Sequence, residues 1–203
     1  MKSGFVSIVG RPNVGKSTLL NSLLERKIAI TSNVSGTTRN IIQGIYNDDD
    51  SQIVFIDTPG IHKPQNKLGT YLNQKAYMMT EDVDLLLFLV DVEKGFGKGD
   101  QFILEKIKQE NKPTFLILNK VDRIKKEELF EIITELNKLH DFKEIIPVSA
   151  LKGDNVVDLL NTIKKYLNDD VNIDLSKLLY VNLINHKFSF WILSTPTAWK
   201  MSR

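Results

Sequence analysis

The sequence contains no cysteine among its 203 residues. This absence excludes disulfide bonds and thiolate metal sites within the sequence. No apolar run approaches the roughly 18 residues that a membrane-spanning helix requires. The apolar stretch in MKSGFVSIVG is too short for a secretory signal. We therefore expect a cytoplasmic protein.

A strong excess of one charge is also lacking. The chain has 27 Lys and Arg against 25 Asp and Glu, for a formal net charge of +2. This balance neither indicates nor excludes contact with nucleic acid or with an acidic membrane surface. Hydrophobic residues make up 42% and charged residues 26%, as is typical of a globular protein. The length allows one sizeable core and a small appendage.

Short apolar runs alternate with amphipathic segments along most of the chain. The runs predict six strands, at Phe5–Val9, Ile41–Tyr46, Gln52–Asp57, Asp84–Val92, Thr114–Asn119 and Glu144–Ser149. The amphipathic segments predict five helices, at Lys16–Glu25, Leu68–Met79, Asp100–Gln109, Lys126–Leu139 and Val156–Leu167. The alternation predicts an α/β fold, a mainly parallel six-stranded sheet with helices on both faces.

One connection departs from this alternation. Only Asn47–Ser51 separates the second and third predicted strands. That segment is too short for a helical crossover, so these two strands should form a hairpin. We therefore expect a mixed sheet with one antiparallel edge strand.

A glycine-rich segment follows the first strand and opens the first helix. It reads GRPNVGKS and fits the phosphate-loop pattern G-x-x-x-x-G-K-[S/T]. In this pattern backbone N–H groups and the helix N-terminus cradle a phosphate. Lys16 would reach the β- and γ-phosphates, and the Ser17 hydroxyl would ligate Mg²⁺. We assign to nucleotide binding Gly10, Arg11, Pro12, Asn13, Val14, Gly15, Lys16, Ser17 and Thr18.

The segment after the fifth strand indicates which base is bound. A carboxylate at Asp122 can accept two hydrogen bonds from the N1–H and exocyclic amine of guanine, whereas adenine would leave it unpaired. Asn119 would tie this loop to the phosphate loop, and the Lys120 stem would lie over the purine. The segment after the last strand would add a backbone N–H to the guanine O6. The expected base-binding residues are Asn119, Lys120, Val121, Asp122, Ser149, Ala150 and Leu151.

Two further segments would read the γ-phosphate and complete the magnesium site. Asp57 would hold Mg²⁺ through water, and the Gly60 N–H would contact the γ-phosphate. In the polar loop before the hairpin, Thr37 or Thr38 would complete the coordination, and we favour Thr38. The expected magnesium ligands are Ser17, Thr38 and Asp57. The third strand also contributes Asp57, Thr58, Pro59, Gly60 and Ile61 to the nucleotide site.

The residue after Gly60 bears on the rate of hydrolysis. Many GTPases carry a glutamine there that orients the attacking water, and this chain has Ile61. Isoleucine can neither orient nor activate water, so hydrolysis should be slow or should use another group. His62 is nearby, but a lone histidine in a loop is more often solvated than catalytic.

With these motifs in order, the chain resembles the Era family of bacterial Ras-type GTPases. The resemblance covers roughly Ser3–Asn168 and is carried by GRPNVGKSTLLNSLL, SGTTRNIIQGIY, DTPGIHKPQNKLGTYLNQKA, NKVD and VSALKG. It implies a Ras-like P-loop GTPase domain and a GTP-hydrolysing switch in maturation of the small ribosomal subunit. Its implied partners are GTP and GDP, 16S rRNA, the 30S subunit and the inner face of the cell membrane.

The resemblance also implies details of the site. Asn13 would help to hold a potassium ion that substitutes for an arginine finger. The competing interpretation is that this asparagine only favours the turn. Residues expected to act in catalysis are Lys16, Thr38, Gly60 and Asn13. We expect a monomer.

The C-terminal segment departs from the family pattern. Family members carry a KH domain that grips single-stranded RNA with a GxxG loop, whereas Gly153 is the last glycine here. We expect a GTPase domain over residues 1–168 and an atypical tail over 169–203. Truncation with a changed reading frame is the favoured explanation, with loss of the RNA-binding module or a genuine short extension as alternatives. RNA binding is correspondingly in question.

Several functions therefore remain open. The leading hypothesis is a GTP-hydrolysing switch. The second is a nucleotide-dependent binding module that does not depend on turnover, and Ile61, in place of a water-orienting glutamine, is consistent with it. A third is a truncated product without a role. An ATPase or small-molecule kinase is disfavoured by the NKVD segment.

Overall fold

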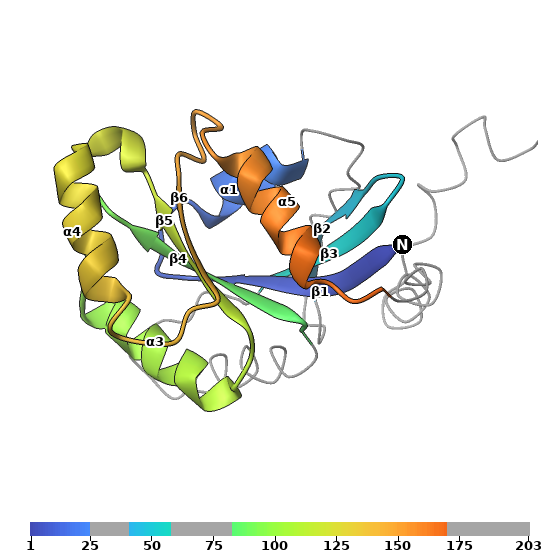
Figure 1. The fold of residues 1–203 in the computed structure, drawn as a ribbon, viewed down its shortest axis with the longest axis horizontal. Coiled ribbons are helices and arrows are strands. Elements are labelled where there is room, and N and C mark those ends of the chain that lie inside the picture. The colour runs from blue at the N-terminus through green and yellow to red at the C-terminus, as the bar shows by residue number, and fades with distance from the viewer. Residues whose placement is uncertain (25–40, 58–82, 170–203) are drawn as a thin grey trace, which may run out of the picture. The chain divides into compact units, whose positions relative to one another are not determined.

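The structure is a computed structural model that describes residues 1–24, 41–57 and 83–169 (Figure 1). All of these belong to the first of the chain's two units, Met1–Ile173. The expected helix Leu68–Met79 and the expected tail from residue 170 lie outside the described residues.

The described residues form one six-stranded sheet in the order β2-β3-β1-β4-β5-β6. The edge strand β2 is antiparallel to β3, and the other neighbouring pairs are parallel, so the predicted mixed α/β sheet is confirmed. The strands are β1 (Lys2–Val9), β2 (Ile41–Asn47), β3 (Ser51–Asp57), β4 (Leu85–Asp91), β5 (Thr114–Asn119) and β6 (Glu144–Val148). The described helices are α1 (Lys16–Leu24), α3 (Lys98–Glu110), η1 (Val121–Arg123), α4 (Lys126–Leu136) and α5 (Val156–Tyr166).

The ends of three elements, β1, α3 and α4, differ from the sequence prediction by two or more residues. Strand β1 begins at Lys2 rather than at Phe5, because its parallel pairing with β3 already starts there. Helix α3 begins at Lys98 rather than Asp100, because the Asp100 carboxylate accepts the N–H of Gly97 and caps the helix start.

Helix α4 ends three residues earlier than predicted, at Leu136 rather than Leu139. The N–H groups of Lys138 and Leu139 donate to carbonyls three positions back, at Glu135 and Leu136. Such bonds tighten the last turn and end the α-helix.

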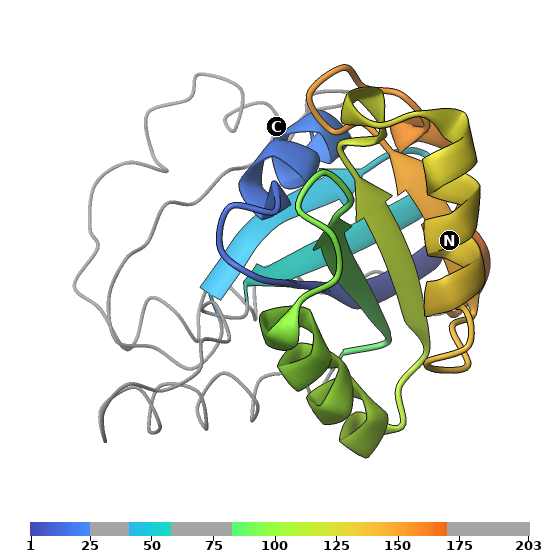
Figure 2. The ribbon, with the colours of Figure 1, turned by 90° about the vertical axis from the view of Figure 1, so that its left-hand side faces the viewer.

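The sheet is covered on both faces. Helices α1 and α5 lie on one face, where Leu19, Leu23 and Leu159 pack with alternate residues of the central strands (Figure 1). Helix α3 covers the other face with Ile103 and Ile107 buried (Figure 2). The crossover through α4 runs in the same direction along the sheet as that through α3, and its right-handedness assigns α4 to the same face as α3.

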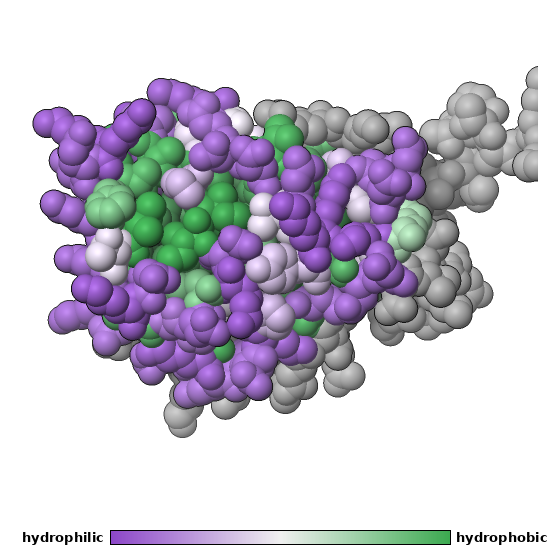
Figure 3. Space-filling view, viewed as in Figure 1, coloured by the Kyte–Doolittle hydropathy of each residue, from purple (hydrophilic) through white to green (hydrophobic). Residues whose placement is uncertain are grey.

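The last strand is less covered than the centre of the sheet. Glu144 to Pro147 of β6 are only half-buried, although Ile146 packs against the core. Figure 3 shows apolar surface in this area, over β5 and β6 and between α4 and α5, rimmed by hydrophilic side chains. Of the large apolar side chains nearby, Phe130 on α4 is 71% exposed.

The topology brings the motifs to one edge. Parallel strands end at the same edge of a sheet, so the loops after β1, β4, β5 and β6 are neighbours there. These loops are the phosphate loop, the segment from Val92, the NKVD segment and the segment from Ser149. Within the described ranges, no helix is long and apolar enough to span a membrane.

Candidate functional site

The phosphate loop connects β1 to α1 and is closed by its own lysine. The ammonium of Lys16 donates hydrogen bonds of 2.8 Å to the carbonyls of Gly10 and Arg11. Asn13 has a left-handed backbone with φ of 63°, which asparagine tolerates better than most residues. Its side chain is exposed, as are those of Ser17 and Thr18 at the start of α1.

Gly15 is fixed by both its backbone and its neighbour. Its φ is +101°, a conformation that side chains strongly disfavour. A Cβ at this position would lie 2.3 Å from the Nδ2 of Asn119. The glycine therefore permits the phosphate loop to contact the residue that follows β5.

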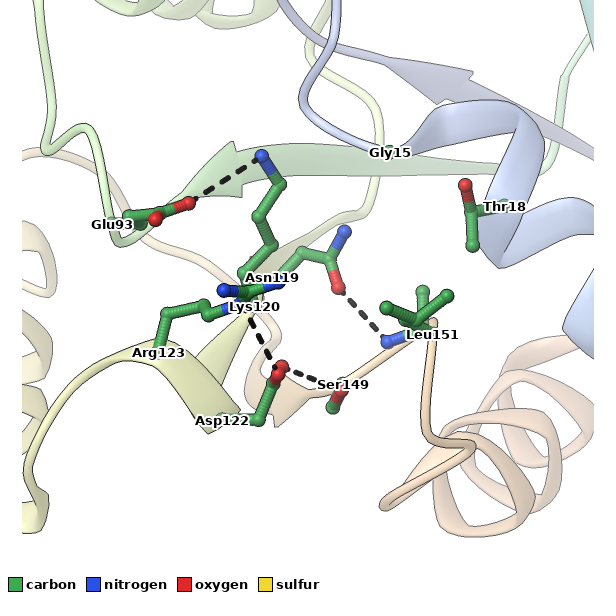
Figure 4. Close-up of a pocket in the computed structure, with 10 residues that line it drawn as sticks. Gly15, Thr18, Glu93, Asn119, Lys120, Asp122, Arg123, Ser149 and Leu151 are labelled. Atoms are coloured by element: carbon green, nitrogen blue, oxygen red, sulfur yellow. Dashed lines mark hydrogen bonds and ion pairs between the residues drawn. The ribbon is translucent and has the colours of Figure 1, made fainter.

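Asn119 connects the loop after β5, to which it belongs, with the phosphate loop and with the loop after β6. The sequence predicts the first of these two connections. Its Nδ2 donates to the carbonyl of Val14 at 2.8 Å, and its Oδ1 accepts from the N–H of Ala150 at 3.0 Å (Figure 4). The residue is 2% exposed. Which N–H of the segment after β6 would reach a guanine O6 stays a prediction, because that of Ala150 is bonded to Asn119.

Asp122 is held by the loop after β6. The Ser149 hydroxyl donates to its Oδ1 at 2.7 Å. This bond lowers the pKa of Asp122 below its usual value, and burial opposes the effect only in part. Arg123 and Lys152 add positive charge at 3.5 and 3.8 Å from its Oδ2. The carboxylate is thus kept ionised, as an acceptor for two N–H donors must be.

The position of Lys120 is set by its backbone conformation and by an ion pair of its side-chain ammonium. Its backbone is left-handed, with φ of 70° and ψ of 34°. Its ammonium binds Asp91 at the end of β4 at 2.5 Å, and Asp91 is 1% exposed. The N–H groups of Glu93 and Lys94 donate to the same carboxylate. These contacts fix the course of the lysine stem beside the pocket.

A pocket of about 180 Å³ lies between these loops (Figure 4). Its walls come from the phosphate loop and α1, from the loop after β4, and from the loops after β5 and β6. The lining residues are Gly15, Thr18, Glu93, Asn119, Lys120, Asp122, Arg123, Ser149, Ala150 and Leu151.

Two of the lining residues, Glu93 and Arg123, were not predicted from the sequence. A signal for Glu93 was available, because it follows β4 at the edge where such sheets bind ligands. For Arg123 the signal was its place directly after Asp122. Leu151 is 74% exposed at the rim of the pocket.

The other predicted site residues have mixed outcomes. Val14 is buried, Pro12 is exposed and Val121 begins η1 beside the pocket. Asp57 ends β3 and is in register with Ile8, close to the start of the phosphate loop along β1. The remaining predicted residues lie outside the described ranges, namely Thr38, Thr58, Pro59, Gly60 and Ile61, and so do the less favoured Thr37 and His62.

The side chain of Arg11 is directed to α3. Its Nε donates to Asp100 at 2.8 Å, and its Nη2 donates to the carbonyl of Gly95 at 2.8 Å. Any part it plays in phosphate binding would therefore be through its main chain.

The comparison with protein families agrees with this geometry. Residues 5–120 match the family described as 50S ribosome-binding GTPase. The chain belongs to this family. The matched range holds the phosphate loop and the first two residues of the NKVD segment.

Curated relatives confirm the resemblance to Era within this family. The chain is 54% identical over 166 residues to GTPase Era of Lactobacillus helveticus, covering 82% of this chain and 55% of that protein. It is 50% identical over 167 residues to GTPase Era of Clostridium kluyveri, covering 82% and 57%. The chain thus spans a little over half the length of these relatives.

Solved structures support the same assignment of fold. One similar structure is an Aquifex aeolicus Era variant bound to GDP·AlF4⁻, with a TM-score of 0.72, 43% identity, and coverage of 84% of this chain and 59% of that one. Another is Era in complex with MgGDPNP and a 16S ribosomal RNA segment, with a TM-score of 0.73, 42% identity, and coverage of 85% and 59%. The predicted Ras-like GTPase fold is confirmed.

Proposed function

We propose that this GTPase-family chain binds GTP and GDP and hydrolyses GTP to GDP and phosphate, as a switch. The observation that carries the proposal is the pocket between the phosphate loop and Asp122. The Ser149 hydroxyl donates to the Asp122 carboxylate at 2.7 Å and favours its ionised form. An ionised carboxylate there accepts from the two N–H donors of guanine and is mismatched to adenine. Lys16 and the backbone of the loop would receive the phosphates.

Magnesium is the cofactor we propose for this site. Ser17 is exposed at the start of α1, and Asp57 ends the strand next to β1. Hydroxyl and carboxylate oxygens are the donors that Mg²⁺ prefers, so these residues fit the ion. With Thr38, whose position lies outside the described residues, they would hold it. The ion would supply positive charge to the phosphate oxygens.

Potassium is a finer proposal that rests on Asn13. Its side chain is exposed on the phosphate loop, and its left-handed backbone is also what a simple turn residue would have. We propose that hydrolysis is faster in potassium than in sodium salts, with Asn13, Lys16, Thr38 and Gly60 acting in catalysis. An Asn13→Gly variant keeps the left-handed turn and removes the amide, so it should lose the potassium effect and retain GDP binding.

Base recognition is tested with Asp122→Asn. The amide keeps one acceptor for Ser149 and reverses the polarity of the other atom, so it should favour xanthine over guanine nucleotides. We expect the ratio of GDP to XDP affinity to fall by at least about a hundredfold. The matched control is Asp141→Asn, whose side chain is 87% exposed. An unchanged preference for guanine nucleotides in Asp122→Asn would show that Asp122 does not recognise the base.

A nucleotide-dependent binding module is the alternative function, and Ile61 favours it because isoleucine cannot orient water. Single-turnover hydrolysis of GTP, in potassium and in sodium salts, separates the two. Product phosphate in either salt supports the switch. Nucleotide binding without turnover in both salts supports the binding module.

The partners are proposed from the relatives. A solved Era structure contains a 16S ribosomal RNA segment. We propose small-subunit RNA as the partner, with peripheral contact to the inner face of the membrane. Binding of this chain to a labelled RNA of nucleotides 1506–1542 of 16S ribosomal RNA, with GTP and with GDP, tests whether residues 1–203 suffice.

A further inference from the structure

A tether connects the phosphate loop to the start of α3. The Nε of Arg11 lies 2.7 Å from the Oδ2 of Asp100 and donates to its Oδ1 at 2.8 Å. The Nη2 of Arg11 donates to the carbonyl of Gly95 at 2.8 Å. The N–H of Gly97 donates to the Oδ2 of Asp100 at 2.8 Å. We call Arg11, Asp100 and Gly95 the loop tether.

The burial and pairing of Asp100 indicate that the loop tether is part of the folded core and not a chance surface contact. The side chain of Asp100 is 0% exposed, although aspartate is rarely fully buried unless it is paired. Burial raises the pKa of Asp100, and the Gly97 N–H and Arg11 oppose this rise by favouring the carboxylate. A guanidinium is suited to this place because its planar fork serves the carboxylate and a carbonyl at once.

The same contact explains one glycine of the segment GFGKGD, Gly99. A Cβ at Gly99 would lie 2.8 Å from the Cδ of Arg11, and one at Gly97 would lie 3.4 Å from its Nη1. The stem of Arg11 therefore runs directly across the first turn of α3. A side chain at position 99 would displace it.

The main chain of Arg11 is also part of the phosphate loop. Its carbonyl accepts a hydrogen bond from the Lys16 ammonium, as does the carbonyl of Gly10. The loop tether thus holds the backbone segment against which Lys16 is placed. Because Lys16 is the side chain expected at the β-phosphate, its position decides how strongly that phosphate is bound.

We propose that Arg11 is a positioning residue, which fixes the phosphate loop to α3 through Asp100 and Gly95 and so sets the position of Lys16. The arginine acts on nucleotide affinity through the loop backbone and not through contact of its guanidinium with phosphate. This inference rests on the proposed nucleotide binding. It predicts that loss of the loop tether weakens recognition of the β-phosphate more than recognition of the nucleoside.

The experiment compares GDP and GMP, by competition against fluorescent mant-GDP, in four variants. Asp100→Asn weakens the ion pair directly. Gly99→Ala displaces Arg11 while leaving both charged groups in place, and alanine favours the helix more than glycine does. The controls are Asn161→Ala, an exposed helical position on α5, and Lys164→Met, which breaks the ion pair with Asp48 on the hairpin.

In Asp100→Asn and Gly99→Ala we expect GDP affinity to fall about tenfold, and GMP affinity to change less than about twofold. Both controls should bind GDP and GMP as the unmodified chain does. Equal losses for GDP and GMP, or an unchanged GDP affinity in Gly99→Ala, would overturn the positioning role. If Asp100→Asn does not fold, Gly99→Ala alone decides the matter. If the unmodified chain binds neither GDP nor GMP, the proposed nucleotide binding is itself wrong. The titration of the unmodified chain therefore distinguishes this outcome from a failure of the positioning role alone.

Discussion

The amide of Asn119 donates a hydrogen bond of 2.8 Å to the carbonyl of Val14, across 105 positions of sequence. The same side chain accepts from the N–H of Ala150 at 3.0 Å. One buried residue thereby connects the phosphate-loop segment to the loops after β5 and β6. In the proposed function, this distance would have to match the length of a nucleotide.

Replacing Asn119 by Ala should therefore reduce both stability and binding. It leaves the carbonyl of Val14 and the N–H of Ala150 buried without this partner, which should cost about 2–3 kcal/mol of unfolding free energy. Urea unfolding and GDP titration measure the two effects. Thr134→Ala, at an exposed position on α4, is the control and should change neither. A variant as stable as the original chain would contradict the linking role of Asn119.

Ser149→Ala should shift the pH dependence of GDP binding. The Ser149 bond lowers the pKa of Asp122, so its loss moves that pKa up toward the ordinary value. Because guanine needs the ionised carboxylate, affinity is retained above the pKa and is lost as the pH falls through it. The affinity of the variant should begin to fall at a higher pH than that of the original chain. Coincident GDP affinity profiles between pH 3 and 7 would show that Ser149 has no such effect.

The hairpin is joined to α5 by an ion pair between Asp48 and Lys164, whose side chains are 12% and 21% exposed. Burial raises the pKa of Asp48, but hydrogen bonds from Lys164, Ser51 and Tyr46 outweigh it and hold the pKa well below its usual range. Lys164→Met should destabilise the chain by about 2 kcal/mol at pH 7, since it leaves a partly buried carboxylate without its cation.

The pH dependence of this ion pair follows from the lowered pKa. A carboxylate with a depressed pKa stabilises the fold above its unfolded pKa of about 4, and this contribution is lost as the pH falls toward the folded value. The difference in unfolding free energy between the original chain and Asp48→Asn should thus be constant above about pH 5 and shrink in acid. A difference that does not change between pH 7 and pH 3 would contradict this.

Gly15→Ala should be more damaging than Gly95→Ala. Both positions have positive φ, of +101° and +68°, so both variants carry backbone strain. A Cβ at Gly15 would lie 2.3 Å from Asn119, whereas a Cβ at Gly95 would meet nothing within 4 Å. We expect Gly95→Ala to cost about 1 kcal/mol of unfolding free energy and Gly15→Ala at least about 1 kcal/mol more. Thermal or urea unfolding measures the difference, and equal losses would show that the contact with Asn119 relaxes freely.

Much of the fold followed from local pattern. The apolar runs identified six strands, and the clearest are β4 and β5, which are buried at every position and therefore read as continuous hydrophobic sequence. The short Asn47–Ser51 connection determined the antiparallel edge, since a helix cannot fit into it. The phosphate loop and the NKVD segment were recognisable because their chemistry needs particular residues at fixed local spacing.

The sequence could not predict the contacts between segments that are distant along the chain. The pairing of Arg11 with Asp100 spans 89 positions, and that of Lys164 with Asp48 spans 116. Many charged residues stand on exposed surfaces, and nothing local distinguishes the few that become buried partners. Nothing in the local sequence indicates that the side chain of Arg11 lies against Gly97 and Gly99. The sequence by itself determined the class of fold, the motifs and their order. Only the tertiary structure decided which side chains hold those motifs in place, because that depends on how the strand ends are brought together at one edge of the sheet.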